Sequence, residues 1–117
     1  MTKRTRFPGF ERCLKMMRHS NPSINEEGFG LLEPRATEYL PQLIAAFWDE
    51  GNGVSRGWLI ELIGTATSPA ALPFLLERLH DDNESIRYWA VWGLRELNTK
   101  EARTALWRAG LASGNHD

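Results

Sequence analysis

The feature that most constrains the fold is an internal repeat. One part of the sequence corresponds to a later part at a spacing of 31 residues, through the pairs Arg56 and Arg87, Trp58 and Trp89, Ile60 and Val91, Ile63 and Leu94, Ala71 and Ala102, and Leu75 and Leu106. The segment before it corresponds at a spacing of 32, through Leu40 and Leu72, Pro41 and Pro73, Leu43 and Leu75, Ile44 and Leu76, and Phe47 and Leu79. Because one such unit cannot bury its apolar flank alone, we expect successive units to stack on one another.

Apolar residues recur at helical spacing along the chain, and the alternation of a β-strand is nowhere sustained. This pattern predicts helices over 10–19, 24–32, 35–48, 54–64, 69–80, 84–97 and 100–111. Cap residues precede several of them, at Ser68-Pro69, at Asp81-Asp82-Asn83-Glu84 and at Thr99, and Gly51-Asn52-Gly53 predicts a turn. The connections are short, so consecutive helices should be antiparallel neighbours.

The expected architecture is therefore all-α. We expect one domain over 1–117, a short right-handed superhelix of two helical hairpins and a last helix, regular over 34–112. The two N-terminal helices would form an atypical cap. The expected core residues of 10–19 are Phe10, Cys13, Leu14 and Met17, and those of 84–97 are Ile86, Ala90, Gly93, Leu94 and Leu97. Those of 24–32 are Ile24, Phe29, Leu31 and Leu32.

Composition limits the class of protein. The chain has 117 residues, 42% of them apolar and 25% charged, which is typical of a globular domain, and Cys13 as its one cysteine excludes an internal disulfide framework. No apolar run reaches membrane-spanning length, and no secretory signal is recognisable, so we expect a cytoplasmic protein without a membrane partner. Six Lys/Arg stand against Glu11 alone over 1–20, and the rest of the chain is acidic. We expect residues 1–9 to form a flexible basic arm.

The repeat resembles a known family. The stretch Leu79 to Leu94 has a leucine, an acidic turn at Asp81-Asp82, the pair Ile86-Arg87, then Ala90 and Leu94, and this order resembles the second half of a HEAT repeat of the phycobiliprotein-lyase type. Ser68 to Leu76 resembles the first half, and the resemblance extends over about 34–108. It implies that second helices line a concave surface, and that Arg56 and Arg87 tie neighbouring repeats to acidic turns such as Asp81 and Asp82.

No catalytic set is apparent. Cys13 lies in an amphipathic stretch and is expected to behave as a small hydrophobe. His19, His80 and His116 are far apart and lack ligand-like partners, so we expect no metal and no cofactor. The acidic run 81–84 lacks the spacing of a calcium loop and is better interpreted as a helix cap. The chain is therefore predicted not to be an enzyme.

Aromatic residues in the second helices indicate binding instead. The expected partner-binding residues on the concave face are Trp58, Glu61, Tyr88, Trp89, Trp92 and Arg95. Alternatively the tryptophans fill a small core, an interpretation that we favour for Trp58 and Trp89, whereas we expect Tyr88 and Trp92 at the surface. The sequence favours no particular oligomeric state.

Three functions compete. The first is a protein-binding module, and the resemblance to small bacterial immunity proteins implies an inhibitor of a cognate toxin with a basic domain. The second is nucleic-acid binding, which the acidic body disfavours. The third, implied by the subfamily resemblance alone, is a bilin lyase or chaperone, although such proteins usually have more repeats.

Overall fold

The computed structural model describes residues 6–49 and 53–111. Within them the chain forms α-helices and two short 3-10 helices, and no strand. The helices are α1 (Phe10–Met17), α2 (Pro22–Leu32), η1 (Glu33–Arg35), α3 (Leu40–Asp49), α4 (Gly53–Thr65), η2 (Pro69–Ala71), α5 (Leu72–Arg78), α6 (Glu84–Leu97) and α7 (Lys100–Arg108). The predicted all-α class is confirmed.

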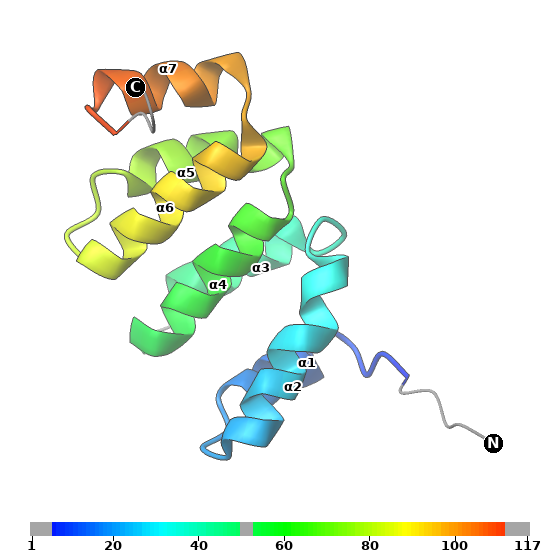
Figure 1. The fold of residues 1–117 in the computed structure, drawn as a ribbon. Coiled ribbons are helices and arrows are strands. Elements are labelled where there is room, and N and C mark those ends of the chain that lie inside the picture. Colours follow the sequence, from blue (N-terminus) through cyan, green and yellow to red (C-terminus); the bar gives the residue numbers. More distant parts are fainter. Residues whose placement is uncertain (1–5, 50–52, 112–117) are drawn as a thin grey trace.

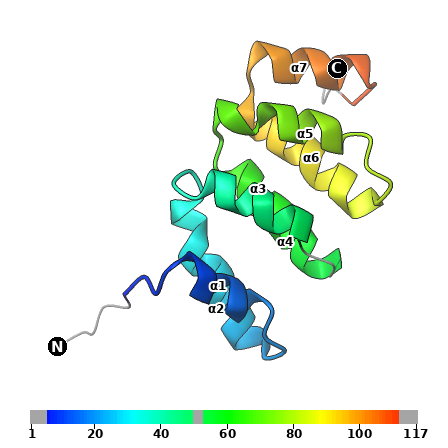
Figure 2. The ribbon, with the colours of Figure 1, turned by 180° about the vertical axis from the view of Figure 1, so that it is seen from behind.

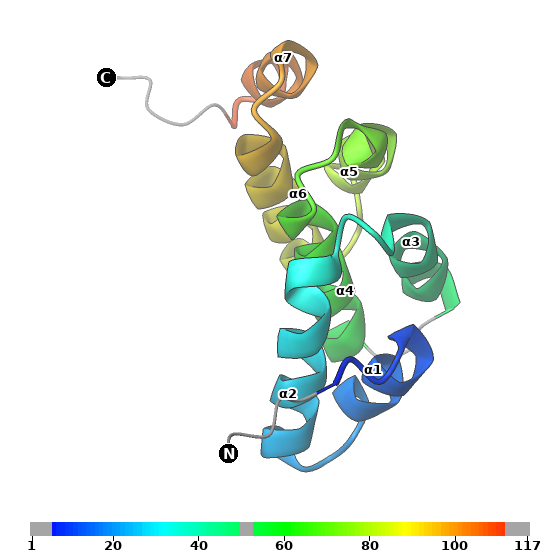
Figure 3. The ribbon, with the colours of Figure 1, turned by 90° about the vertical axis from the view of Figure 1, so that its right-hand side faces the viewer.

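The helices form three stacked hairpins and a last helix (Figure 1). In the edge view, α2, α4 and α6 make one layer, and α1, α3 and α5 make the other (Figure 3). Figure 2 shows the layer of first helices from its own side, with α7 continuing the stack beyond α5. The molecule measures 51 × 32 × 25 Å, as expected for an elongated stack. The two layers enclose the core, to which α4 contributes four fully buried side chains, Leu59, Ile60, Leu62 and Ile63.

The N-terminal helices continue the stack. The sequence places an atypical cap here, but α1 and α2 pack together as a hairpin like the two that follow (Figure 1). Aromatic contacts join this hairpin to the next: the Phe29 ring lies 5.1 Å from that of Trp58, and Phe10 lies 5.3 Å from Tyr39. All four core residues predicted for 10–19 are buried.

The N-terminal arm is partly packed. Residues 1–5 of the predicted basic arm lie outside the described residues, but Phe7 stacks on Tyr39 at 5.7 Å. The guanidinium of Arg35 lies 4.3 Å from the centre of the Phe7 ring. The described end of the expected flexible arm therefore lies against the first connection between hairpins. Of the predicted Gly51-Asn52-Gly53 turn, the first two residues lie outside the described residues.

Local capping chemistry sets several helix starts. The side chain of Asn83 accepts a hydrogen bond from the N–H of Ile86 (3.1 Å), and that of Thr99 accepts one from Ala102 (3.1 Å). Ser68 caps η2 in the same way, through the N–H of Ala70. Each bond satisfies an N–H that a helix leaves without an internal partner. At the other end of α6, Asn98 takes the left-handed conformation (φ 54°) that ends a helix.

Prolines explain where the sequence prediction was wrong. The helices predicted over 35–48 and 69–80 begin at Leu40 and Leu72 instead, and each is preceded by a 3-10 turn. In both, the next residue is a proline, Pro41 or Pro73, which lacks an N–H and is tolerated only in the first helical turn. The α-helix therefore starts at the residue before the proline. The last helix ends at Arg108, short of the predicted 111, and Gly110 has a positive φ of 74°.

Candidate functional site

The contact between α4 and α6 positions the second-helix face, which we define as the outer surface of α2, α4 and α6. A methyl group built on Gly64 would lie 3.0 Å from Cα of Gly93, and one on Gly57 would lie 4.0 Å from Oγ of Ser85. The order of these two pairs shows that α4 and α6 run parallel. Glycines let the two backbones approach closely, which fixes the register between the hairpins.

Two tryptophans lie along this contact. The same methyl group on Gly64 would lie 3.0 Å from ring carbon Cζ3 of Trp92, so this indole lies over the glycine. Trp89 meets Trp92 edge to face, with ring centres 5.4 Å apart. Both side chains are half-buried, and Trp89 packs against the core. The second-helix face thus has an aromatic pair at the joint between hairpins.

Trp58 and Glu61 lie on α4, beside this pair. Trp58 is half-buried between the core and Phe29 of α2. By the register of the glycines, Glu61 lies level with Trp89. Desolvation by partial burial, followed by the nearby charge of Glu33, raises the pKa of Glu61 above its usual range. The carboxylates of Glu61 and Glu33 therefore repel one another, and a cation placed beside Glu61 would relieve the repulsion.

Tyr88 and Arg95 lie on a different flank of α6. Tyr88 is 62% exposed and meets Trp89 edge to face at 5.1 Å. Together with Arg95 it lines a hollow that ends at Leu111, beyond α7. Arg95 donates a hydrogen bond from Nη2 to the carbonyl of Leu111 (2.9 Å). The six residues predicted as one patch thus lie on two adjoining surfaces. Tyr88 and Arg95 line the hollow on one flank of α6, and the other four lie on α4 and α6 around the contact between these helices, namely Trp58, Glu61, Trp89 and Trp92.

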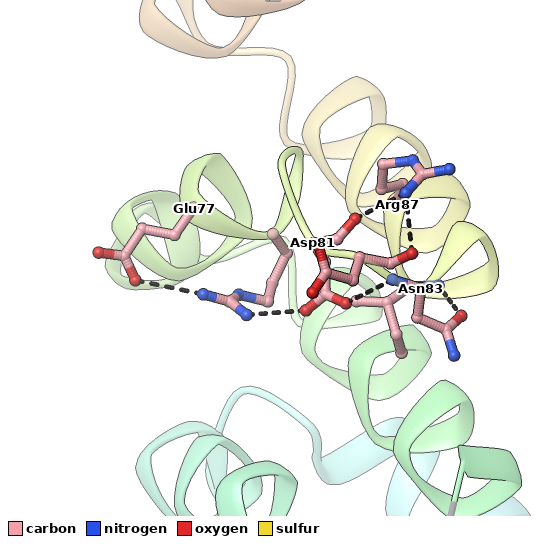
Figure 4. Close-up of polar contacts among 7 residues, drawn as sticks. Glu77, Asp81, Asn83 and Arg87 are labelled. Carbon is pink, nitrogen blue, oxygen red and sulfur yellow. Dashed lines mark hydrogen bonds and ion pairs between the residues drawn. The ribbon is translucent and has the colours of Figure 1, made fainter.

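The two repeated arginines make contacts inside their hairpins. Nη1 of Arg87 donates to the carbonyl oxygens of Asp81 (2.7 Å) and Asp82 (3.2 Å), in the turn that precedes its own helix (Figure 4). The guanidinium of Arg56 lies 4.2 Å from the ring centre of Phe47, on the first helix of its own hairpin. These contacts lie within one hairpin, whereas the sequence resemblance implied contacts between neighbouring repeats. Arg87 binds backbone carbonyls of the turn, whereas the Asp81 carboxylate pairs with Arg78 at 2.8 Å.

Two exposed tryptophans were not singled out from the sequence. Trp48 is 53% exposed at the end of α3, where the Arg78 guanidinium lies 4.7 Å from its ring centre. Trp107 is 71% exposed on α7, beside Arg103 and Arg108. The helical spacing of Arg103, Trp107 and Arg108 in the sequence could have indicated that Trp107 lies on a surface with two arginines. The arginine beside Trp48 lies on another helix, α5, so no local sequence pattern indicates this contact.

The described residues contain little that suggests chemistry. Cys13 is fully buried, and desolvation raises the pKa of its thiol despite the opposing charge of Arg35. Within residues 6–49 and 53–111, no three His, Cys, Asp or Glu side chains gather as metal ligands would. His116, one of the histidines considered above, lies outside these ranges. In the same ranges, no helix has the length and apolar character needed to cross a membrane.

Stacked helical hairpins of this kind define a helical-repeat protein, a class that generally presents an extended binding surface. The family model described as HEAT repeats matches residues 40–117, and the chain belongs to this family. Such repeats are generally protein-interaction modules and non-enzymatic scaffolds. Comparison with curated proteins and with solved structures gives no match.

Proposed function

We propose that this chain binds a protein partner through the second-helix face around Trp92, and that the partner is a basic toxin domain, which binding neutralises. The observation that carries the proposal is the pairing of Trp89 and Trp92 level with Glu61 of α4, whose carboxylate is repelled by that of Glu33. Tryptophans in such positions supply large contact areas at low entropic cost. The carboxylates select a cationic partner.

The charge of the chain supports the same partner. The body after residue 20 is acidic, and its field attracts a basic domain over distances of about 10 Å at ordinary ionic strength. Fast association suits an inhibitor that must capture its toxin before the toxin acts. Charges of this kind raise the association rate more than they raise the affinity. Binding should therefore weaken with added salt mainly because association slows.

The test is capture of partners by the full-length chain from the cells that naturally produce it, with identification by mass spectrometry. We expect one basic, toxin-like protein, and protection of cells that express this toxin when the chain is co-expressed. Trp92→Ala and Glu61→Lys should each weaken binding at least about tenfold, as hot-spot substitutions do. Trp107→Ala is the matched control, because its indole is more exposed but lies on α7.

Far-UV circular dichroism of each variant separates loss of binding from loss of fold. If folded Trp92→Ala and Glu61→Lys bind the partner as the wild type does, the second-helix face is not the site. If the captured partner is acidic, or if the chain does not protect cells from it, the toxin-inhibitor proposal is wrong.

A further inference from the structure

The joint between α4 and α6 shows how one hairpin covers the next. On α4, the flank that faces α6 consists of Gly57, Ile60 and Gly64, all three of which are buried. The spacing of three and four residues puts them on one side of the helix. Helix α6 lies against this side, so the flank is covered by the second helix of the following hairpin.

Within the described residues, no second helix covers the equivalent flank of α6. At the repeat spacing of 31, Gly57, Ile60 and Gly64 correspond to Tyr88, Val91 and Arg95 of α6. Helix α7 takes the place of the next first helix (Figure 2), and within the described part of the chain no second helix follows it. The flank instead borders a hollow of about 380 Å³, lined by Leu79, Glu84, Arg87, Tyr88, Val91, Arg95 and Leu111.

The hollow combines an apolar floor with a positive rim. Leu79 is 8% exposed at its base, Val91 is half-buried, and Leu111 closes the end near α7. Of the charged side chains that line the hollow, two are arginines, Arg87 and Arg95, and one is a carboxylate, Glu84. Arg87 binds the carbonyls of the Asp81-Asp82 turn, and Arg95 binds that of Leu111, so both guanidinium groups are held at the rim. By contrast, the charged residue of α4 that lies level with Trp89 is a carboxylate, Glu61. Tyrosine and arginine around a small apolar depression are the residue types found at binding hot spots.

We propose that this surface, the C-terminal flank of α6 formed by Tyr88, Val91, Arg95 and Leu111, binds an amphipathic helix that carries carboxylates and belongs to a protein partner. The partner helix takes the place on α6 that α6 takes on α4, and with α7 it forms a fourth hairpin. The bulk of Tyr88 and Arg95 keeps it farther out than the contact between Gly64 and Gly93. An aliphatic side chain enters the hollow, and a carboxylate pairs with Arg95.

The inference is independent of the proposed toxin inhibition. The second-helix face selects a basic partner, whereas the C-terminal flank selects an acidic segment. A chain with both surfaces can hold two segments at once, from one partner or from two. The two proposals can therefore fail separately.

The test uses two synthetic helical peptides of 14 residues, the length of α6. Both peptides carry an identical apolar stripe of leucines and alanines. One peptide has glutamates beside the stripe, and the other has lysines at the same positions. Binding to the full-length chain is measured by calorimetry, and the contacted amides are identified by NMR. We expect the glutamate peptide to bind, with shifted amides in 84–95 and 106–111, and the lysine peptide not to bind.

Charge reversal gives the decisive comparison. Arg95→Glu should weaken binding of the glutamate peptide at least about tenfold and should create binding of the lysine peptide. Arg108→Glu is the matched control, because this arginine is exposed on α7 beside Trp107 and away from the hollow. Trp92→Ala and Glu61→Lys should leave peptide binding unchanged, which keeps the test separate from that of the second-helix face.

Several results would overturn the inference. Equal binding of both peptides, or unchanged binding to Arg95→Glu, would show that charge does not select the ligand. NMR shifts confined to other helices would place the site elsewhere. Dimerisation of the chain through this flank, seen by sedimentation, would make a second copy the occupant. Displacement of the glutamate peptide by a DNA duplex would make nucleic acid the ligand.

Discussion

At the scale of single residues, Glu61 carries an electrostatic cost that the fold tolerates. Its pKa is raised by partial burial and by Glu33. A carboxyl group with a raised pKa in the folded state favours folding when it is protonated, and this contribution is lost as the pH rises through the folded pKa. At neutral pH, the charged form of Glu61 therefore opposes folding.

We predict that Glu61→Gln raises the free energy of unfolding at pH 7, because it removes a partly desolvated charge and its repulsion by Glu33. The gain should disappear below about pH 4, where glutamates are protonated in both states. Urea unfolding of both proteins across this pH range measures the difference. Glu38→Gln is the control: its carboxylate lies 3.4 Å from Arg35, so its loss at pH 7 should be neutral or slightly destabilising. A gain for Glu61→Gln that persists at pH 3.5 would contradict the electrostatic explanation.

Single residues also show why part of the site escaped prediction. Gly93 was placed in the core from its helical position, but nothing near Gly64 in the sequence indicates that it meets Gly93 across a helix pair. A glycine within a helical pattern indicates only a weaker helix. Tyr88 and Trp92 are four residues apart on α6, yet they lie on different surfaces. Helix α4 covers the flank that carries Trp92, whereas Tyr88 lines the hollow on the other flank.

At the scale of helices, α2 contains two glycines with opposite roles. A methyl group on Gly28 would lie 2.7 Å from the carbonyl oxygen of Cys13 and 2.7 Å from Cβ of Met16, whereas one on Gly30 would meet nothing within 4 Å. The first glycine lets α1 and α2 touch. The second leaves a helix position without a side chain.

Alanine at these two positions should therefore act in opposite directions. Gly28→Ala is expected to lower the free energy of unfolding by about 1–3 kcal/mol, since the backbone of α1 must move away. Gly30→Ala should raise it by about 0.5–1 kcal/mol, the usual gain in helix propensity. Denaturant unfolding of the two variants is the measurement. Similar effects of the two substitutions would show that α1 does not approach α2 as closely as the structure indicates.

Helix prediction from the sequence was most accurate where capping is local. The helix predicted over 84–97 has these bounds in the structure. The side chain of Asn83 caps its start, and the left-handed backbone of Asn98 ends it. The helices that contain Pro41 and Pro73 were placed too early, although the two prolines correspond in the repeat and exclude α-helical hydrogen bonding at the same point. Their late starts were therefore within reach of the sequence.

At the scale of the whole molecule, the stack of hairpins extends farther toward the N-terminus than the repeat signal indicates. The repeat signal stops near residue 34, but the hairpin of α1 and α2 continues the architecture without it. Stacking needs only an apolar flank of suitable shape. Here Phe29 and Phe10 form that flank, and their rings pack against those of Trp58 and Tyr39 in the next part of the chain. In such an array each unit is stabilised by its nearest neighbours, so an end hairpin can open without the rest.

Cys13 reports on this opening. Its thiol is fully buried in the terminal hairpin and its pKa is raised, so alkylation requires α1 to separate from α2. We predict that Gly28→Ala speeds alkylation of Cys13 by iodoacetamide at neutral pH, about tenfold for each 1.4 kcal/mol of local destabilisation. Leu106→Ala removes a buried side chain from α7, at the other end, and should destabilise the fold by about 2–5 kcal/mol. If the hairpins open separately, Leu106→Ala leaves the alkylation rate unchanged, as followed by mass spectrometry without denaturant. If it accelerates alkylation as much as Gly28→Ala does for an equal loss of stability, the chain opens as one cooperative unit, and the nearest-neighbour description does not apply to a stack this short.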